Sequence, residues 1–540
     1  MNWPGDPGTS FKTPTRIAYK KENPDNKDME GDCWGFEVFP KLTSCSWTKL
    51  LLDKKAAVEV YDDPTLFSEV TTQGMMRLPA FRDASGVCED FLRKLFEHLL
   101  TELHKEMTES ILANTPMECW ITLPAIWSDE AKDATLQAAK KAGFGARPGD
   151  EVFTIAEPEA AAIAALKKYA AADSLNPVKP KENILILDCG GGTVDITTYK
   201  ITQVEPRLDF EELCVGIGGK CGSTYIDRRL HVFLSEKLGA AFKHASWALK
   251  GPGSNFMNTF ESVKRNFGIK KKARVQGLPI KLGILESEYY DDDDRCVKLS
   301  YDDVERLFAP VIKEIINLVE NQVQDVKKNS GGRIDRIILV GGFGSSPYLF
   351  NALEEWCTEN GNITLIKPEH PQSAIVRGAA IRGLEGIAPR MKRARRHYGF
   401  AISMEFRDGT DPESTAYIDD FDGEKIFSDT FRTQDVEMSY TPGEPVYLTM
   451  RLYSCGLNTP PEYVTNPRVD EVGSIVASFD RNYDFGPNIR STYSFKLGKI
   501  VYKFPHQLQV RFGNKGENLQ FKILVEGRVV SEAVIEFGQH

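Results

Sequence analysis

Three consecutive glycines between two acidic residues form the stretch with the clearest chemical potential. Residues 184–201 predict a strand, a glycine turn and a second strand, and the turn contains Asp188, Gly190, Gly191, Gly192, Thr193 and Asp195. Backbone N–H groups of such a turn can converge on one phosphate and form an anion-binding nest. The acid at the strand end can hold Mg²⁺ through water or orient an attacking water. The alternative is a plain β-hairpin whose glycines only satisfy the turn geometry.

This turn differs from two common nucleotide-binding motifs. A P-loop leads from a strand into a helix and carries Gly-Lys-Ser/Thr, which does not follow Gly192. The dinucleotide fingerprint also opens a helix, whereas residues 194–201 alternate in the manner of a strand. The functional interpretation is therefore a phosphate-binding hairpin.

A second glycine turn follows the predicted strand at 336–340. Gly341 and Gly342 come directly after it, and Ser345 or Ser346 with Pro347 can cap a new helix. Two glycines let the backbone approach a flat ligand such as a base or ribose, and a helix N-terminus favours anions. The alternative is an ordinary strand-to-helix turn, of which α/β folds contain several.

A third candidate is a charged triplet with helical spacing. Glu261, Lys264 and Arg265 stand at i, i+3 and i+4, so a helix would place them on one side. They could hydrogen-bond ribose hydroxyls and stack on a base. A solvated charged helix face is the alternative interpretation.

The elements that position these residues change character near residue 390. Before it, β-like runs alternate with periodic helices, expected at 88–112, 129–142, from 156 onward with Pro158 in the first turn, and 301–328. After it, the pattern predicts short antiparallel strands, including 500–504, 508–512, 519–525 and 529–537, with a turn at 513–516. The sequence therefore predicts a mixed α/β part followed by a β-rich module.

Composition excludes several classes of protein. The 540 residues carry 67 basic and 77 acidic side chains, a net charge of −10, which argues against a globally basic nucleic-acid binder. With 41% apolar residues the chain can bury a core, and no run of about 18 apolar residues suggests a membrane span. Ten scattered cysteines without a C-x-x-C pair predict no zinc site and reduced thiols. The first residues predict no secretory signal.

Four segments in a fixed order together resemble the ATPase domain of the seventy-kilodalton heat-shock chaperone family, within the actin-like ATPase superfamily. They are Ala156-Glu157-Pro158-Glu-Ala-Ala-Ala-Ile, Leu187 to Asp195, Glu261-x-x-Lys264-Arg265, and Leu339 to Pro347. The resemblance covers roughly residues 1–385. The segment at 218–225 and the second glycine turn look more like the family's divergent, lid-poor branch.

The resemblance implies an α/β, actin-like two-lobed ATPase fold with a ribonuclease H-like motif at 1–388. It implies an upper-lobe insertion at about 222–330, a basic linker at 389–397 and a β-rich, peptide-binding module at 398–540. ATP or ADP and Mg²⁺ are the expected cofactors. By analogy, Gly190, Gly191, Gly192 and Thr193 hold the phosphates, and Asp188 and Glu157 organise Mg²⁺ and its waters, with Asp188 acting on the metal through water. Asp188, Glu157 and Thr193 are the expected catalytic residues.

On the nucleoside side, the resemblance assigns Glu261, Lys264 and Arg265 to ribose and adenine, with Gly341, Gly342 and Ser345 opposite them. Pro124 and Glu157 resemble the elements that link nucleotide state to the following domain.

Three departures from the family pattern bear on turnover. The family's first phosphate hairpin, Asp-x-Gly-Thr-Thr, is absent, and residues 12–19 resemble the strand that follows it, so an N-terminally incomplete chain is expected. For the family's catalytic lysine the matching region offers only Lys41. Gln372 stands where the family often places Asp. Whether ATP is hydrolysed therefore stays open.

Two functions remain from the sequence. The first is an ATP-binding, chaperone-like protein in which ATP hydrolysis switches a β-rich substrate module, with unfolded or extended peptides and co-chaperones as partners. The second is a nucleotide-binding regulatory or interaction protein that lacks turnover. Neither specific nucleic acid nor a membrane is an expected partner. A cytoplasmic location is expected; the nucleus is an alternative, because five of the seven residues at 390–396 are basic, a pattern that a solvated linker also explains.

Overall fold

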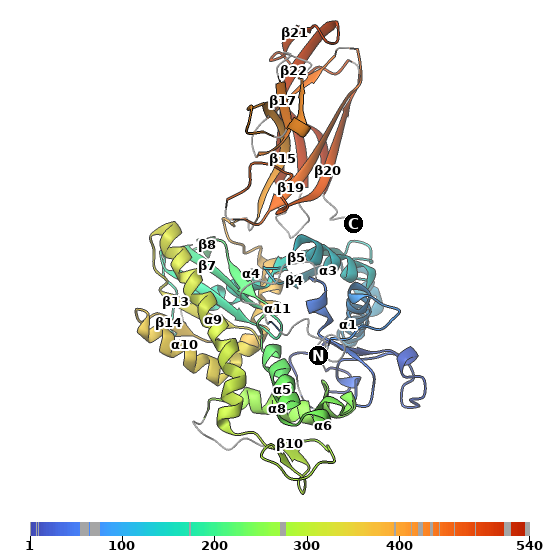
Figure 1. The fold of residues 1–540 in the computed structure, drawn as a ribbon, viewed down its shortest axis with the longest axis vertical. Helices are drawn as coiled ribbons and strands as arrows, with labels where there is room; N and C mark the ends of the chain where they lie inside the picture. The colour runs from blue at the N-terminus through green and yellow to red at the C-terminus, as the bar shows by residue number, and fades with distance from the viewer. Residues whose placement is uncertain are drawn as a thin grey trace. The chain divides into compact units, whose positions relative to one another are not determined.

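The computed structural model divides the chain into two compact units, Met1–Arg393 and Ala394–His540 (Figure 1). No helix in the described part of the chain is both long and apolar enough to cross a membrane. The structure describes residues 2–6, 8, 10–53, 64, 76–171, 174–269, 277–393, 396–411, 413–418, 425–432, 436–441, 443–457, 459–480, 482–511 and 520–534.

A six-stranded sheet, here the central sheet, forms the core of the first unit, in the order β14-β13-β6-β7-β8 with β9 paired to β7. Its strands are β6 (Asn183–Cys189), β7 (Val194–Gln203), β8 (Asp209–Glu212), β9 (Ile217–Gly219), β13 (Arg336–Val340) and β14 (Thr364–Ile366). β6, β7 and β8 are antiparallel, whereas β13 is parallel to β6 and β14. Apolar runs such as Ile184–Leu187 are fully buried because helices cover both faces.

Alternate residues of β6 enter different cores. Leu185 and Leu187 pack with α5 (Thr224–Lys237), α8 (Asn255–Asn266), α9 (Tyr301–Ser330) and α10 (Pro347–Glu359). Ile184 and Ile186 pack with α4 (Glu157–Ala170) and α11 (Ala374–Glu385). This side-chain alternation is the period of two expected of a strand. The helices predicted from 156 and over 301–328 are confirmed.

Smaller elements complete this half of the unit. The short helices are α6 (Ala240–Lys243), α7 (Trp247–Lys250), η5 (Phe343–Ser345) and η6 (Pro371–Ser373), and a small sheet has the order β10-β12-β11. Its strands are β10 (Leu278–Pro279), β11 (Tyr290–Asp291) and β12 (Cys296–Val297).

The first region, here residues 10–156, has short strands. Its described residues form two separate small sheets: β1 (Arg16–Ala18) between β2 (Cys33–Trp34) and β3 (Cys45–Ser46), and β4 (Glu118–Leu123) parallel to β5 (Glu151–Ala156). They also form the helices η1 (Lys20–Glu22), η2 (Gly35–Glu37), η3 (Thr48–Leu51), α1 (Ala84–Glu106), α2 (Glu109–Asn114) and α3 (Asp129–Lys141).

The helix predicted over 88–112 is interrupted. Met107 has an extended backbone, with φ −142° and ψ 153°, and the side chain of Thr108 caps α2. A threonine that caps a new helix is more stable there than inside a continuous one. The helix predicted at 129–142 is confirmed, with Ser128 as its N-cap.

Two helices cross at very close range beneath the central sheet. A β-carbon added at Gly378 on α11 would lie 1.6 Å from the carbonyl oxygen of Ala160 on α4. α11 also reaches β4, because a β-carbon at Gly383 would lie 2.7 Å from Nε1 of Trp120. The crossing therefore joins the β4–β5 pair to the helical layer of the central sheet.

The second unit is β-rich, as predicted. One sheet has the order β16-β17-β15-β19-β20, and the other has β18-β22-β23-β24 with β21 paired to β22. The strands are β15 (His397–Glu405), β16 (Ala416–Ile418), β17 (Lys425–Arg432), β18 (Val436–Tyr440), β19 (Val446–Cys455), β20 (Val469–Phe479), β21 (Arg490–Ser494), β22 (Lys499–Arg511), β23 (Gln520–Val525) and β24 (Arg528–Val534).

The strands predicted at 500–504 and 508–512 are one long strand, β22. Its first half pairs with β18 and β21, and its second half pairs with β23. A change of partner along one continuous strand cannot be read from local alternation. The predicted turn at 513–516 lies outside the described residues.

Candidate functional site

The glycine hairpin between β6 and β7 is held from one side by the start of α5. Its three glycine carbonyls accept backbone hydrogen bonds of 2.9–3.1 Å: Gly190 from Ser223, Gly191 from Thr224 and Gly192 from Gly222. In the described part of the chain, the N–H groups of Gly191, Gly192 and Thr193 have no acceptor. Adjacent N–H groups without a protein acceptor are what an anion-binding nest requires.

As far as the described residues show, the space beside Gly191 is open. A β-carbon added there would meet nothing closer than Cγ2 of Thr224 at 3.9 Å. By contrast, a β-carbon at Gly222 would lie 2.5 Å from the Gly191 carbonyl oxygen, so the contact between the hairpin and α5 requires glycine at 222. The hairpin is tightly packed on the side of α5 and open around Gly191.

Asp188 is the last residue but one of β6, directly before the hairpin, and is 2% exposed. Its Oδ1 has no hydrogen-bond partner in the described structure. Burial raises the pKa of Asp188 well above its usual range; Glu157 and Asp195 raise it further, and Lys12 and Lys49 oppose the shift. A buried carboxylate oxygen without a donor is costly, so a cation, a water or a ligand donor would stabilise this position.

The second glycine turn lies at the same edge of the central sheet. The parallel register sets Val340 opposite Asp188, which brings the two turns together. Gly341 has φ +86°, and a β-carbon there would lie 2.3 Å from the Cys189 carbonyl oxygen and 2.4 Å from Oδ1 of Asp188. Only glycine fits this position.

The second turn and the start of α10 contain both exposed residues and a helix cap. Gly342 and Ser345 are exposed, as a ligand contact would require. Ser346, one of the two predicted caps, is the N-cap of α10, where its side chain accepts from the N–H of Leu349 at 3.4 Å, and Pro347 is the first helical residue.

Glu157 is paired with a lysine that the sequence did not reveal. Glu157 is the first residue of α4, and Nζ of Lys49 on η3 lies 2.5 Å from its Oε1. Lys41, the lysine that the sequence offered, is exposed. Lys49 reaches the site because η3 packs on the hairpin: a β-carbon at Gly192 would lie 2.8 Å from Leu50. No sequence motif marks such a long-range contact.

Lys12 is a second basic residue at the site that no sequence pattern identified. Its Nζ would lie 3.8 Å from a β-carbon added at Gly342. Loss of hydration lowers the pKa of Lys12, while the charges of Asp188 and Glu157 oppose this shift. The residue is nevertheless accessible to solvent, so its ammonium group lies in an open site.

Asp195 supports the backbone. Its Oδ1 accepts hydrogen bonds from the N–H groups of Ala125 at 2.8 Å and Ile126 at 3.3 Å. The turn that follows Pro124 is therefore attached to the base of the hairpin, on strand β7.

The charged triplet on α8 does not point in one direction. Lys264 has a side chain 7% exposed and pairs with Asp227 at 2.7 Å and Glu261 at 2.9 Å, whereas the Arg265 side chain is 76% exposed. Burial alone would lower the pKa of Lys264, but the two carboxylates together raise it. Burial would also raise the pKa of Glu261, but Lys264 and Arg265 bring it to about 2. Glu261 and Arg265 remain available to a ligand, and Lys264 fixes α8 to α5.

The predicted Mg²⁺ ligands do not form a free acidic pair. Glu157 is neutralised by Lys49, and Oδ1 of Asp195 is committed to the backbone. Among the described residues, no three His, Cys, Asp or Glu side chains gather as a metal site. Oδ1 of Asp188 has no hydrogen-bond partner among the described residues. The residues therefore do not fit a Mg²⁺ site organised by Asp188 and Glu157 together, and the role of Asp188 through water stays a prediction.

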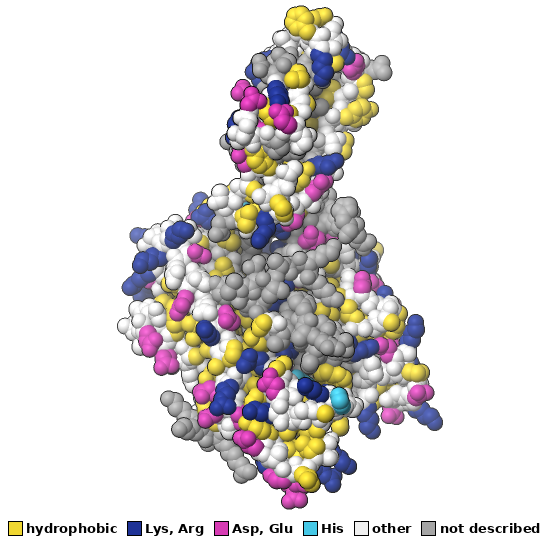
Figure 2. All heavy atoms as spheres, in the orientation of Figure 1, with side chains coloured by type: hydrophobic (Ala, Val, Ile, Leu, Met, Phe, Trp, Pro, Cys, Tyr) yellow, Lys and Arg dark blue, Asp and Glu magenta, His cyan; other side chains and the backbone are white. Residues whose placement is uncertain are grey.

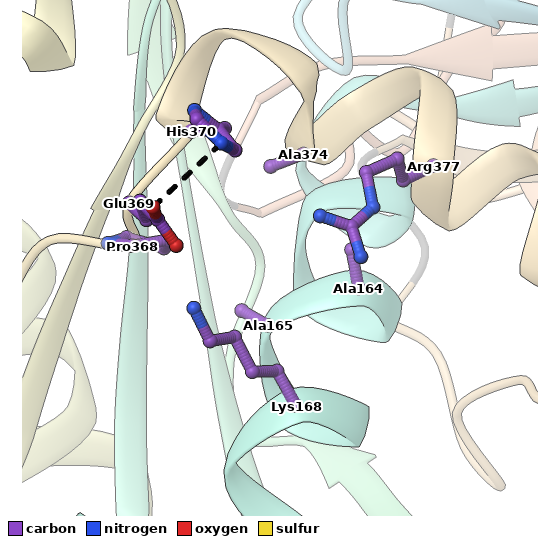
Figure 3. A pocket seen from close by; sticks show the side chains of 8 residues that line it. All are labelled: Ala164, Ala165, Lys168, Pro368, Glu369, His370, Ala374 and Arg377. Carbon is purple, nitrogen blue, oxygen red and sulfur yellow. Dashed lines mark ion pairs between the residues drawn. The ribbon is translucent and has the colours of Figure 1, made fainter.

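A separate small pocket lies between α4, α11 and the loop at 368–370 (Figure 3). Its lining residues are Ala164, Ala165, Lys168, Pro368, Glu369, His370, Ala374 and Arg377. It encloses about 50 Å³, far less than the roughly 300–1,000 Å³ of a typical ligand site. None of the predicted site residues lines it, so it is not the nucleotide site.

Comparisons with known proteins identify relatives over most of the chain. The family model described as "Hsp70 protein" matches residues 93–388. The chain is similar to "Heat shock 70 kDa protein 12A" of Homo sapiens and of Mus musculus, 24% identical over 87% of this chain and 79% of each relative. It is 23% identical to "Heat shock 70 kDa protein 12B" of Homo sapiens over 87% of this chain and 78% of that protein.

Proposed function

Because the chain belongs to the Hsp70 family, we propose that its first unit binds ATP or ADP where the two glycine turns meet. The observation that carries the proposal is the row of N–H groups from Gly191 to Thr193, which have no acceptor among the described residues and lie beside the open space at Gly191. A polyphosphate can accept these hydrogen bonds. The buried strands β6 and β13 hold both turns rigidly, which is what a preorganised phosphate site requires.

The remaining predicted residues are placed around the nucleoside. In this proposal, the exposed side chains of Glu261 and Arg265 contact ribose and adenine from α8, and Gly342 and Ser345 approach from the other turn. Lys264 acts indirectly, because its ammonium group is paired with Asp227 on α5. The same helix α5 begins against the glycine hairpin, so α8 and the phosphate site are mechanically connected. The wider two-lobed arrangement is part of this proposal.

The site can bind a nucleotide, but it offers few side chains that would accelerate hydrolysis. Phosphoryl transfer depends on positioning and on neutralising charge. Lys49 and Lys12 can supply positive charge, and Asp188 can orient a water through its unpartnered oxygen. We therefore propose a nucleotide-dependent, chaperone-like protein. The second candidate is a regulatory protein without turnover. One observation supports it: in the described structure, only one glycine hairpin lies at the proposed phosphate site.

The second unit carries a surface suited to an extended peptide. Four apolar side chains at the β21–β22 hairpin, here the apolar tip, are exposed: Tyr493 51%, Phe495 92%, Leu497 41% and Ile500 51%. Figure 2 shows hydrophobic side chains at the end of this unit where Figure 1 labels β21. Exposed apolar groups that cluster in this way mark interaction sites more often than single ones do. In this proposal, the apolar tip contacts hydrophobic segments of unfolded chains.

For location we propose the cytoplasm. The basic stretch at 390–396 would support nuclear import only if it is accessible. Lys392 pairs with Glu159 at 2.7 Å, and the Arg393 N–H donates to Glu212 at 2.6 Å. Arg396 pairs with Asp470 inside the second unit. These contacts compete with recognition by an import receptor.

A glycine substitution separates binding from folding. Gly191→Val places its side chain in open space in front of the hairpin, so it should fold normally and block the phosphates. Isothermal titration of ATP into the full chain should show saturable binding that Gly191→Val abolishes. Gly31→Val is the matched control, because a β-carbon there meets no atom of the described residues within 4 Å. Unchanged ATP binding by Gly191→Val would contradict the phosphate-hairpin assignment.

Turnover is tested separately under single-turnover conditions with ATP bound. Release of phosphate above the background rate favours the chaperone-like cycle, whereas bound ATP that stays intact favours the regulatory protein. A Phe495→Ser variant tests the peptide surface: it should weaken binding of an unfolded, reduced protein while ATP binding stays unchanged. Equal binding of the unfolded protein by the variant would contradict the role of the apolar tip.

A further inference from the structure

We propose that Lys12 supplies at this site the positive charge that Mg²⁺ would otherwise supply, so that the chain binds ATP without a divalent cation. The inference rests on the proposed nucleotide site and specifies how that site handles phosphate charge. A metal ion at this site must compete with the lysines and backbone N–H groups that already bind the carboxylates.

Two of the three acidic groups near the hairpin, Glu157 and Asp195, already have partners. Glu157 pairs with Lys49 at 2.5 Å, and Asp195 accepts two backbone hydrogen bonds through Oδ1. The charge of Lys12 acts on both Asp188 and Glu157. Two acidic side chains, Asp188 and Glu157, therefore face two ammonium groups. A divalent cation brought to this set would meet repulsion from both lysines, which a hydrated Mg²⁺ with one or two carboxylate ligands normally does not.

The position of Lys12 is suited to a phosphate. Its Nζ lies near Gly342, next to Gly341, where an added β-carbon would lie 2.4 Å from Oδ1 of Asp188. Parallel pairing of β13 and β6 places this turn at the same edge as the glycine hairpin. Lys12 is solvent-accessible, so its ammonium group can turn from Asp188 toward an incoming phosphate. Lysine is a point charge with rotatable donors and suits such a movement better than the planar guanidinium of arginine does.

The Lys49 side chain can also offer positive charge to a phosphate. It is 43% exposed, whereas that of Glu157 is 12% exposed, so the ammonium group is at the solvent side of the pair. A phosphate oxygen can approach it without breaking the contact with Glu157, because an ammonium group has three donors. Two lysines and the N–H groups of the hairpin together give a polyphosphate a positive site.

The first experiment compares two conditions on the full chain. ATP is titrated calorimetrically in buffer with excess EDTA and again with excess MgCl₂. The expected dissociation constants agree within about threefold, a small difference in binding free energy. Binding that occurs only with MgCl₂ would overturn the inference and leave the nucleotide site intact. No binding in either condition would overturn the proposed function itself.

The second experiment assigns the effect to Lys12. Lys12→Met should weaken ATP binding in EDTA by roughly tenfold or more, as expected for loss of a charged hydrogen-bond donor. Excess MgCl₂ should restore part of that affinity, because the vacated position then accepts the metal. Lys27→Met is the matched control, since Lys27 is exposed on the same N-terminal segment.

A conservative variant separates charge from structure. Lys12→Arg should bind ATP in EDTA within about threefold of the wild type, because it keeps the positive charge. Thermal unfolding of all variants checks that the first unit remains folded. Lys12→Met binding ATP in EDTA as tightly as the wild type, or Lys12→Arg binding it as weakly as Lys12→Met, would overturn the assignment to Lys12.

Discussion

The central sheet and the first region contribute to the same site in different ways. The central sheet is continuous, and its strands β6 and β13 are almost fully buried between two helical layers. The described residues of the first region form short strands in two separate small sheets. The glycine turns belong to the rigid part, whereas Lys12 lies before β1 and Lys49 belongs to the short helix η3. The central sheet thus holds the backbone donors of the site, whereas the first region supplies its two lysines.

Specific contacts hold the first region to the central sheet. Leu50 packs against Gly192, Asp195 binds the backbone at Ala125, and Lys220 pairs with Asp53 at 3.1 Å. Because these contacts cluster near the glycine hairpin, loss of one should loosen the first region before the central sheet. Substitutions in both parts of the unit test this difference.

The largest effect is expected where α4 and α11 cross. Gly378→Val would force side-chain atoms into the space taken by the Ala160 backbone, 1.6 Å from the new β-carbon. Neither helix can move away without leaving the central sheet. We expect a loss of about 4 kcal/mol or more in the free energy of unfolding, measured by urea denaturation.

The control for this substitution lies at the end of the same helix. Gly386→Ala introduces a β-carbon into open space at a position with φ +66°. It should cost only about 1 kcal/mol, from backbone strain alone. Similar losses for the two variants would show that the helix crossing is not a rigid joint.

The next effect concerns the ion pair between Lys220 and Asp53. Both side chains are nearly inaccessible, 4% and 2% exposed. Lys220→Met leaves a buried carboxylate without its cation and should cost about 3 kcal/mol. Hydrogen exchange should speed up mainly in the first region, around residues 45–53 and 124–136. Uniform acceleration that includes β6 and β13 would contradict independent loosening of the first region.

A matched variant removes an exposed ion pair. Lys298 pairs with Glu286 on the surface. Lys298→Met should leave the free energy of unfolding nearly unchanged, because solvent screens the pair. A cost equal to that of Lys220→Met would show that burial is not the cause.

A smaller effect depends on pH and lies within the helical layer of the central sheet. His231 is buried against Trp247, and burial, with the charge of Lys250, lowers its pKa to about 3. The unfolded imidazole binds a proton near pH 6.5, so stability is full above that pH and falls between pH 6.5 and 3. Between pH 7.5 and 5 the loss should reach about 2 kcal/mol.

His231→Phe should remove this part of the pH dependence. His244→Gln is the control, because His244 is exposed and its loss should leave the slope unchanged. Urea denaturation at several pH values measures both. A wild-type slope that persists in His231→Phe would assign the acid sensitivity to other groups.

Much of the central sheet could be predicted from the sequence. The apolar run before Asp188, the three glycines and the alternating run after them predict a hairpin, and the apolar run before Gly341 predicts another buried strand. The cap at Ser128 and Pro158 in the first turn of α4 were also readable. These features are local, so a few neighbouring residues determine them.

The contacts that complete the site could not be predicted. Lys49 meets Glu157 across more than a hundred residues, and Lys12 meets the second turn across more than three hundred. Neither lysine belongs to a motif, because an ammonium group needs only reach and space. Burial of Lys264 was also hidden, since its partner Asp227 lies on another helix. Long-range packing, which no local pattern encodes, sets these positions.

Hydrogen exchange with and without ATP shows whether nucleotide binds at the two glycine turns of the central sheet. We predict that ATP slows amide exchange at residues 188–193 and 340–346 in the wild type and leaves these segments unchanged in Gly191→Val. Protection that appears elsewhere, for example around Lys168 and Arg377, or no protection at either turn, would contradict the account.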